Sequence, residues 1–169
     1  MEIYIMNGQG GSGKTTFQDY VAEIVDEEDA VVSVSMVSYV KAIAKTFGWQ
    51  GTKEPKDRKM LSQLKDLLTE WDDSPFRTTC MMVDQARRNG AKIVFIDARE
   101  KADIERLKEK FNCQAVLMVK GEKVNYGNHA DDEVFDINYD ITIYNDGTLE
   151  DLRFAAERFV TYVVKGEKE

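Results

Sequence analysis

The chain has 169 residues, with 31 acidic and 23 basic side chains and a formal charge of −8 at neutral pH. This length predicts one domain over residues 1–169, able to bury a core without metal or disulfide support. Nucleic-acid binding rests on clustered Lys and Arg, which this acidic sequence lacks, so we expect no nucleic-acid partner. Because no apolar stretch approaches the roughly 18 residues of a membrane span, we expect no membrane partner and a cytoplasmic protein.

Apolar patterns predict alternating strands and helices along the chain. Pro55 suits a first helical turn, and Gly48 is a C-terminal stop. The segment between the last two strands, about residues 120–135, is either a lid that closes over a ligand, with Lys120 and Lys123, or a solvated connection. Strands are expected over residues 3–6, 30–37, 92–96, 115–119 and 141–144. Helices are expected over about 13–25, 38–47, 55–71, 74–90, 104–111 and 149–163.

Five strands separated by helices predict an α/β fold of three layers, in which helices cover both faces of a parallel sheet. A phosphate-binding pattern, G-x-x-x-x-G-K-[ST], occupies residues 8–15. It follows the first expected strand and leads into the first expected helix. Glycines without a Cβ let backbone N–H groups surround phosphate oxygens, and the following helix directs its positive dipole end at the same charge. The alternative is a glycine-rich turn that binds nothing. The expected nucleoside triphosphate site comprises Gly8, Gly10, Gly11, Ser12, Gly13, Lys14, Thr15 and Thr16.

Three side chains are expected to do chemistry beside this loop. Lys14 would reach the β- and γ-phosphates, and we expect it to face solvent in the empty loop; the Thr15 hydroxyl would coordinate Mg²⁺. Asp97 ends the strongest strand pattern, from which a carboxylate reaches Mg²⁺; its alternative role is a helix N-cap, with Glu100 at capping-box spacing. Arg99 leaves the same strand end and can clamp a phosphate with two parallel hydrogen bonds. Ligands of such sheets bind at the carboxyl ends of the strands, so residues 8–15, 35–41, 97–99 and 120–129 should face one crevice.

The sequence resembles the deoxynucleoside monophosphate kinase family, part of the P-loop nucleoside monophosphate kinases, over nearly its whole length. The resemblance implies transfer of the γ-phosphoryl group of ATP to a (deoxy)nucleoside 5′-monophosphate with Mg²⁺, and Lys14 and Arg99 would be catalytic. The acceptor would lie in a segment of about residues 35–90. Besides the P-loop, the resemblance rests on Lys41 leading to Phe47-Gly48-Trp49, Arg58 to Leu61 continuing toward Thr69-Glu70, residues 96–99, and residues 145–149. We expect the acceptor to be bound by Ser35, Lys41, Arg58, Arg77 and Arg99.

The sequence departs from these kinases in the expected lid, because no arginine occurs between Arg106 and Arg153. Lysine supplies charge without the fork of arginine. Either Lys120 and Lys123 suffice, or Arg99 and Arg77 do most of the work, or the protein is a slow or altered relative. Two further functions stay open: a kinase of another small phosphorylated metabolite, and a catalytically weak ATP-binding protein. An Asn/Thr-Lys-x-Asp stretch, which would read a guanine base, is absent from the sequence, which disfavours a GTPase. The sequence leaves the preferred base and the existence of a homodimer open.

Overall fold

The computed structural model of the protein describes residues 1–25, 30–52, 54–121 and 133–166. Five strands form one sheet in the order β2-β3-β1-β4-β5, and every neighbouring pair is parallel. The predicted parallel sheet is therefore confirmed. The strands are β1 (Glu2–Asn7), β2 (Val31–Ser35), β3 (Ile93–Asp97), β4 (Gln114–Val119) and β5 (Ile141–Tyr144).

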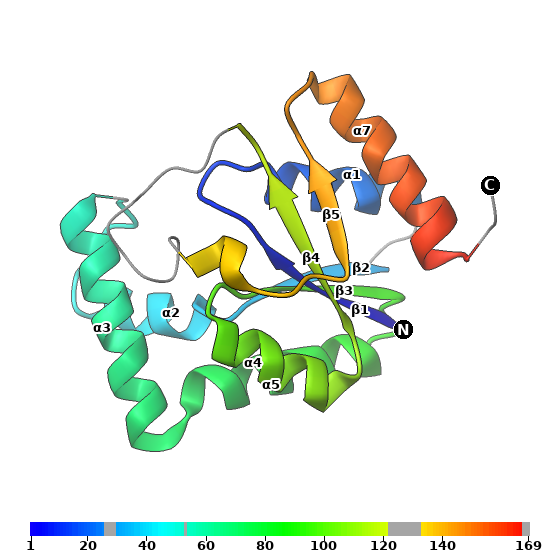
Figure 1. Ribbon diagram of the computed structural model, residues 1–169. Coiled ribbons are helices and arrows are strands. Elements are labelled where there is room, and N and C mark those ends of the chain that lie inside the picture. Colours follow the sequence, from blue (N-terminus) through cyan, green and yellow to red (C-terminus); the bar gives the residue numbers. More distant parts are fainter. Residues whose placement is uncertain (26–29, 53, 122–132, 167–169) are drawn as a thin grey trace.

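Helices connect the strands and cover both faces of the sheet (Figure 1). The predicted helices are all present, and their ends differ from the predicted ones by a few residues. The last predicted helix continues as a π-helix over Phe159–Val164, and a short 3₁₀ helix, Glu133–Asp136, precedes β5. The helices are α1 (Lys14–Val25), α2 (Ser38–Thr46), α3 (Pro55–Asp72), α4 (Ser74–Arg88), α5 (Lys101–Phe111) and α7 (Leu149–Arg158).

Alternation along β1 divides the core into two halves. Ile3 and Ile5 pack with residues of α4 and α5, whereas Tyr4 and Met6 pack with residues of α1, α7 and the π-helix. Successive strand residues point to opposite faces, so one short apolar strand serves both layers. β1 is the middle strand of the sheet and is buried from Ile3 to Asn7. The loop that follows it therefore lies at the centre of the carboxyl edge of the sheet.

Aromatic rings hold α1 against the sheet just below the P-loop. Phe17 is fully buried and meets the ring of Phe159 edge-on at 5.4 Å, and Tyr4 meets the same ring at 4.8 Å. Edge-to-face pairs of this kind are favourable beyond the area that they bury. Because Phe17 lies less than one turn after Lys14, this packing fixes the first turn of α1, where the phosphate is expected.

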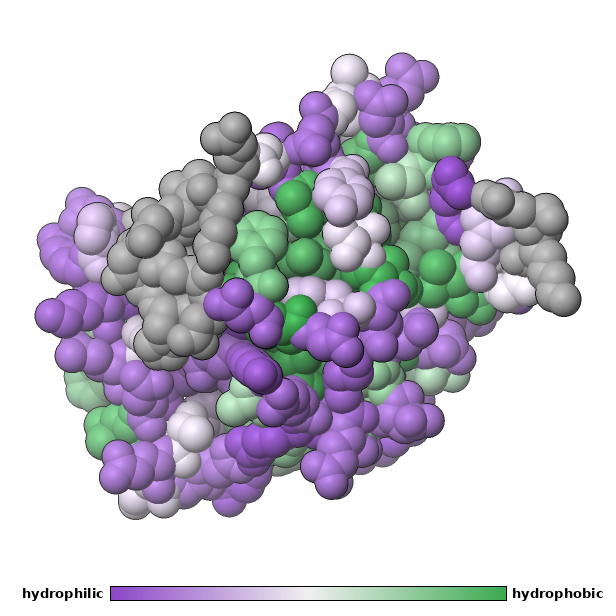
Figure 2. Space-filling model, viewed as in Figure 1, coloured by the Kyte–Doolittle hydropathy of each residue, from purple (hydrophilic) through white to green (hydrophobic). Residues whose placement is uncertain are grey.

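The carboxyl ends of the strands carry the segment expected to hold an acceptor. The chain enters α2 directly after β2, and α3 stands at the left side of Figure 1, packed on α2 and α4. Pro55 occupies the first turn of α3, and Gly48 has a positive φ of 94° after α2, both as predicted. Figure 2 shows hydrophilic side chains over most of this view, with apolar residues reaching the surface mainly over β4, β5 and α7.

Of the two roles considered for Asp97, the helix N-cap is wrong. Helix α5 begins at Lys101 with Glu100 at its N-cap, so Asp97 is not the cap of that helix. Three residues separate the end of β3 from the helix, which leaves the Asp97 side chain for other contacts. Among the described residues, no helix combines the length and the apolar character needed to cross a membrane.

Candidate active site

The P-loop connects β1 to α1 and has a backbone that requires glycine at two crowded positions. Gly8 has a φ of +145°, and a Cβ there would lie under 3.0 Å from the carbonyl oxygen of Met118 on β4. Gly13 has a φ of +96°, and its Cβ would collide with the side-chain amide of Asn145. Gly11 also has a positive φ, of +82°, but no atom lies within 4 Å of a Cβ built there.

Asn145 supports the loop from the carboxyl end of β5. Its Nδ2 donates to the Ser12 carbonyl over 2.9 Å, and its own backbone N–H donates to Val119 over 2.8 Å. Asn145 is 7% exposed, so these bonds replace water that the buried amide would otherwise need. The end of β5 and the P-loop are thus joined through one side chain.

Asn7 anchors the start of the loop. This fully buried residue accepts a hydrogen bond from Gly8 N–H through Oδ1, at 2.7 Å. Its Nδ2 donates to the Arg99 carbonyl over 3.2 Å and to the Tyr139 hydroxyl over 2.7 Å. The Tyr139 hydroxyl in turn donates to the Val134 carbonyl, and burial raises the pKa of Tyr139. Sequence reasoning missed Asn7, although a polar residue at the end of a buried strand was an available signal.

Lys14 does not face solvent as expected for the empty loop. The side chain is half-buried, and its ammonium donates to the carbonyls of Gly8 and Gln9 over 2.6 and 3.2 Å and to Ser12 Oγ over 3.3 Å. Carbonyl oxygens attract the ammonium because they are the nearest negative ends of dipoles. The cation is consequently held inside the loop, where it can exchange these oxygens for those of a phosphate.

Asp97 lies at the carboxyl end of β3, where several of the predicted residues meet. Burial raises the pKa of Asp97, while the Gln18 hydrogen bond and the nearby charges of Lys14, Arg99 and Lys41 lower it. These three cations are therefore close enough to act on one carboxylate. The structure thus places the predicted Lys14, Arg99 and Lys41 near the predicted metal ligand Asp97.

Gln18 orients the Asp97 carboxylate from α1. Its Nε2 donates to Asp97 Oδ1 over 2.9 Å, and its Oε1 accepts from the Ser33 hydroxyl over 2.9 Å. Because the Ser33 hydroxyl donates to the oxygen of the amide, the nitrogen is directed at Asp97. Sequence reasoning missed Gln18, since a polar residue in a helix gives no sign of a partner 79 positions away.

Backbone hydrogen bonds join the strand ends into one edge. Met36 N–H donates to the Asp97 carbonyl over 3.1 Å, and Ala98 N–H donates to the Met6 carbonyl over 3.2 Å. The predicted crevice segments at residues 8–15, 35–41 and 97–99 are thus neighbours. Thr15 is exposed on the first turn of α1, Thr16 is half-buried, and Ser35 Oγ accepts from Val37 N–H over 3.4 Å.

The remaining predicted residues lie further out or beyond the described chain. Arg58 is exposed on the first turn of α3. Arg77 is exposed on α4 and forms an ion pair of 2.6 Å with Asp72, the surface contact that a structural role predicts. Lys120 is exposed directly after β4. Lys123 and most of the expected lid lie outside the described residues.

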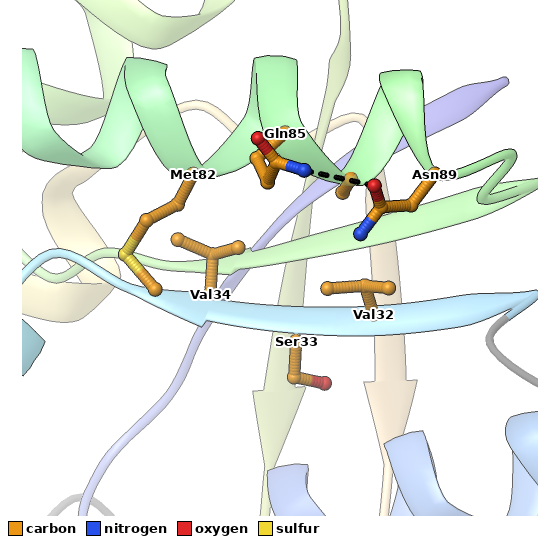
Figure 3. A pocket seen from close by; sticks show the side chains of 7 residues that line it. Val32, Ser33, Val34, Met82, Gln85 and Asn89 are labelled. Atoms are coloured by element: carbon orange, nitrogen blue, oxygen red, sulfur yellow. Dashed lines mark hydrogen bonds between the residues drawn. The ribbon is translucent and has the colours of Figure 1, made fainter.

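A cavity away from the loop has the wrong chemistry for phosphate. It measures about 240 Å³ and lies between edge strand β2 and α4. Figure 3 shows Val32 and Val34 pointing into it, Gln85 bonded to Asn89 above, and Ser33 pointing away toward the other face. No charged side chain lines it. The candidate site is therefore the P-loop edge.

Comparison with known proteins places the fold. The sequence matches no family model and no curated protein. Among solved structures, TT1252 of Thermus thermophilus is 14% identical with a TM-score of 0.55, over 99% of this chain and 98% of that one. A thymidylate kinase of Ehrlichia chaffeensis is 12% identical with a TM-score of 0.53, over 94% and 98% of the two chains.

A third structure, a sugar kinase of Janibacter sp., is 15% identical with a TM-score of 0.52, over 96% of this chain and 94% of that one. All three alignments span nearly the whole of both chains, so the similarity extends beyond the P-loop to the order of the sheet and its helices. At such low identities the likeness concerns the fold. The chain therefore has the three-layer P-loop fold that a thymidylate kinase and a sugar kinase also adopt.

Proposed function

We propose that this chain transfers the γ-phosphoryl group of ATP to a (deoxy)nucleoside 5′-monophosphate. The observation that carries the proposal is the glycine loop at the carboxyl edge of the sheet, beside Asp97, on which the charges of Lys14, Arg99 and Lys41 act. Phosphoryl transfer is mostly positioning and neutralisation of charge, with little covalent chemistry for the protein to do. Three cations around one carboxylate meet that requirement.

In the proposed reaction, an oxygen of the acceptor phosphate attacks the γ-phosphorus. The bond from that phosphorus to the β–γ bridging oxygen breaks, and ADP leaves with the electron pair. Backbone N–H groups of the loop bind the phosphates, and Lys14 exchanges the carbonyls of Gly8 and Gln9 for phosphate oxygens. Arg99, fixed through its carbonyl by Asn7, supplies a forked donor for charge on the transferring group.

Mg²⁺ fits the donor set of this edge. Thr15 offers a hydroxyl and Asp97 a carboxylate, the hard oxygen ligands that this ion prefers. The described residues hold no cluster of three or more His, Cys, Asp or Glu, so the ion would be held as Mg²⁺ commonly is, by one or two protein groups, water and phosphates. When bound, it neutralises charge on the phosphates. Gln18 keeps the Asp97 carboxylate turned for that contact.

We propose that residues 1–169 act as one kinase domain, with the acceptor over residues 35–90 and a lid at about 120–135. Support for the acceptor segment is its place: α2 begins at the carboxyl end of β2, and α3 packs against it. Ser35 is the register partner of Asp97 in the sheet, and the charge of Lys41 acts on Asp97. Arg58 and Arg77 are exposed on α3 and α4. The nucleoside nature of the acceptor rests on the resemblance of the sequence.

A coupled assay of ADP release tests the proposal. ATP and Mg²⁺ are supplied with a panel of nucleoside and deoxynucleoside monophosphates, and the product is identified by mass. Reactions without acceptor measure background hydrolysis, and Lys14→Ala supplies an enzyme without the P-loop cation. We expect acceptor-dependent ADP release with at least one monophosphate. Release with sugar phosphates alone would replace the acceptor class, and no transfer to any acceptor would refute the kinase.

A further inference from the structure

The outer side of α3 carries a row of apolar residues, Met60, Leu64, Leu67 and Trp71, here called the α3 stripe. Leu67 is 61% exposed and Trp71 is 77% exposed, whereas Met60 and Leu64 are half-buried. Spacings of four, three and four residues keep side chains on one side of a helix, and they are the spacings of a helix–helix seam. In Figure 2 apolar residues reach the surface over the lower part of α3. The stripe has the form of a seam without its second helix.

The two ends of α3 differ in charge. Lys56 and Lys59 lie in the first turns, while Asp66 and Glu70 lie toward the end, where α3 has no basic residue in its last turn. At the start, Asp57 forms a capping box with Glu54, and Glu54 pairs with Lys56 over 3.0 Å, so the charge left for an outside contact there is that of Lys59. Within the described parts of the chain, Lys59, Asp66 and Glu70 form no ion pair. A helix that runs in the opposite direction offers charges of the opposite sign to both ends.

We propose that the α3 stripe is a homodimer interface, on which α3 of a second copy packs antiparallel. A two-fold axis between Leu64 and Leu67 sets Met60 of each copy beside Trp71 of the other. The same axis sets the basic start of each helix, with Lys59, along the acidic end of the other, with Glu70. A parallel arrangement would place like charges together. The stripe is thus complementary to itself in shape and charge, which favours a second copy over an unrelated protein.

The size of the seam sets the strength of the dimer. Helix α3 has 18 residues and is about 27 Å long. One pair of such helices buries an area near or below the lower end of the roughly 1,200–2,000 Å² of stable interfaces. We therefore expect an equilibrium between monomer and dimer with a dissociation constant on the order of micromolar. The proposal rests on the α3 stripe and not on the proposed phosphotransfer, so sedimentation tests it without an activity assay.

Sedimentation velocity over nanomolar to hundred-micromolar protein tests the interface. Trp71→Glu places a charge in the seam and should weaken the dimer at least tenfold, and Leu67→Gln should act in the same direction. Phe154→Glu is the matched control, because Phe154 is 60% exposed on α7, at the other side of the molecule in Figure 1. It should leave the dimer unchanged. Far-UV circular dichroism verifies the fold of each variant.

Charge exchange tests the antiparallel arrangement. Lys59→Glu alone and Glu70→Lys alone should each weaken the dimer, and the double exchange should restore it, with a loss at high salt in the parent. A parent that stays monomeric at every concentration overturns the proposal. So does a dimer that Trp71→Glu and Phe154→Glu affect equally. A double exchange no better than the single changes overturns the antiparallel seam.

Discussion

Gly13→Ala compared with Gly11→Ala isolates the contact that holds the P-loop against β5. Both glycines have a positive φ, +96° and +82°, so an alanine is strained at each by about 1 kcal/mol. Only at Gly13 does the new Cβ collide, with the amide of Asn145 that donates to Ser12. Displacing that buried amide costs a further 1–3 kcal/mol or so.

The expected difference between the two variants is about 2 kcal/mol, which corresponds to roughly 4–8 °C in melting temperature for a chain of this size. Urea unfolding followed by circular dichroism measures it. Asn145→Ala removes the colliding amide, so Gly13→Ala should cost much less in that background. Equal losses for the two glycine variants, or no coupling to Asn145, would refute the reasoning.

Three further predictions concern charged residues of the site. Burial raises the pKa of Asp97 in the folded protein, so the contribution of Asp97 to stability falls as the pH rises from the unfolded pKa through the folded pKa. Asp97→Asn should therefore have a higher melting temperature than the parent at neutral pH, and the two melting temperatures should converge in acid. The same variant should lose transfer activity. Arg77→Ala should raise the Michaelis constant for the acceptor more than that for ATP and change the free energy of unfolding by under about 1 kcal/mol, since its pair with Asp72 is exposed; equal effects in steady-state kinetics would assign Arg77 to structure. Lys120→Ala combined with Lys123→Ala should lower single-turnover transfer on the order of tenfold with ATP affinity unchanged; a parental rate would make that segment a connection.

The sequence patterns predicted most of the fold, because each element has a local cause. Apolar residues repeat along α3 and α4 at helical spacing, and β3 is a run of buried residues. The P-loop itself is a local pattern, and Gly8, Gly11 and Gly13 have the positive φ values that the loop needs. Parallel pairing then follows from alternation of strands and helices.

The supports of the site could not be predicted in the same way, because they join residues far apart in sequence. Asn7 bonds to Tyr139 across 132 positions, and Asn145 bonds to Ser12 across 133. Nothing local distinguishes Gln18 from an ordinary surface glutamine. The prediction that Lys14 faces solvent was wrong for a local reason, because the ammonium bonds to the carbonyls of Gly8 and Gln9 within the same loop.

The most direct test of the account is the ATP-dependent rise in melting temperature of the parent and of Lys14→Ala, measured with Mg²⁺ present. At 100 times the dissociation constant, binding stabilises the folded state by about 2.7 kcal/mol, roughly 5–11 °C here. Circular dichroism without ligand should show the same fold in both proteins. We predict a rise of this size in the parent and its loss or strong reduction in Lys14→Ala. An equal rise in both would contradict the central claim that this loop holds the phosphates of ATP.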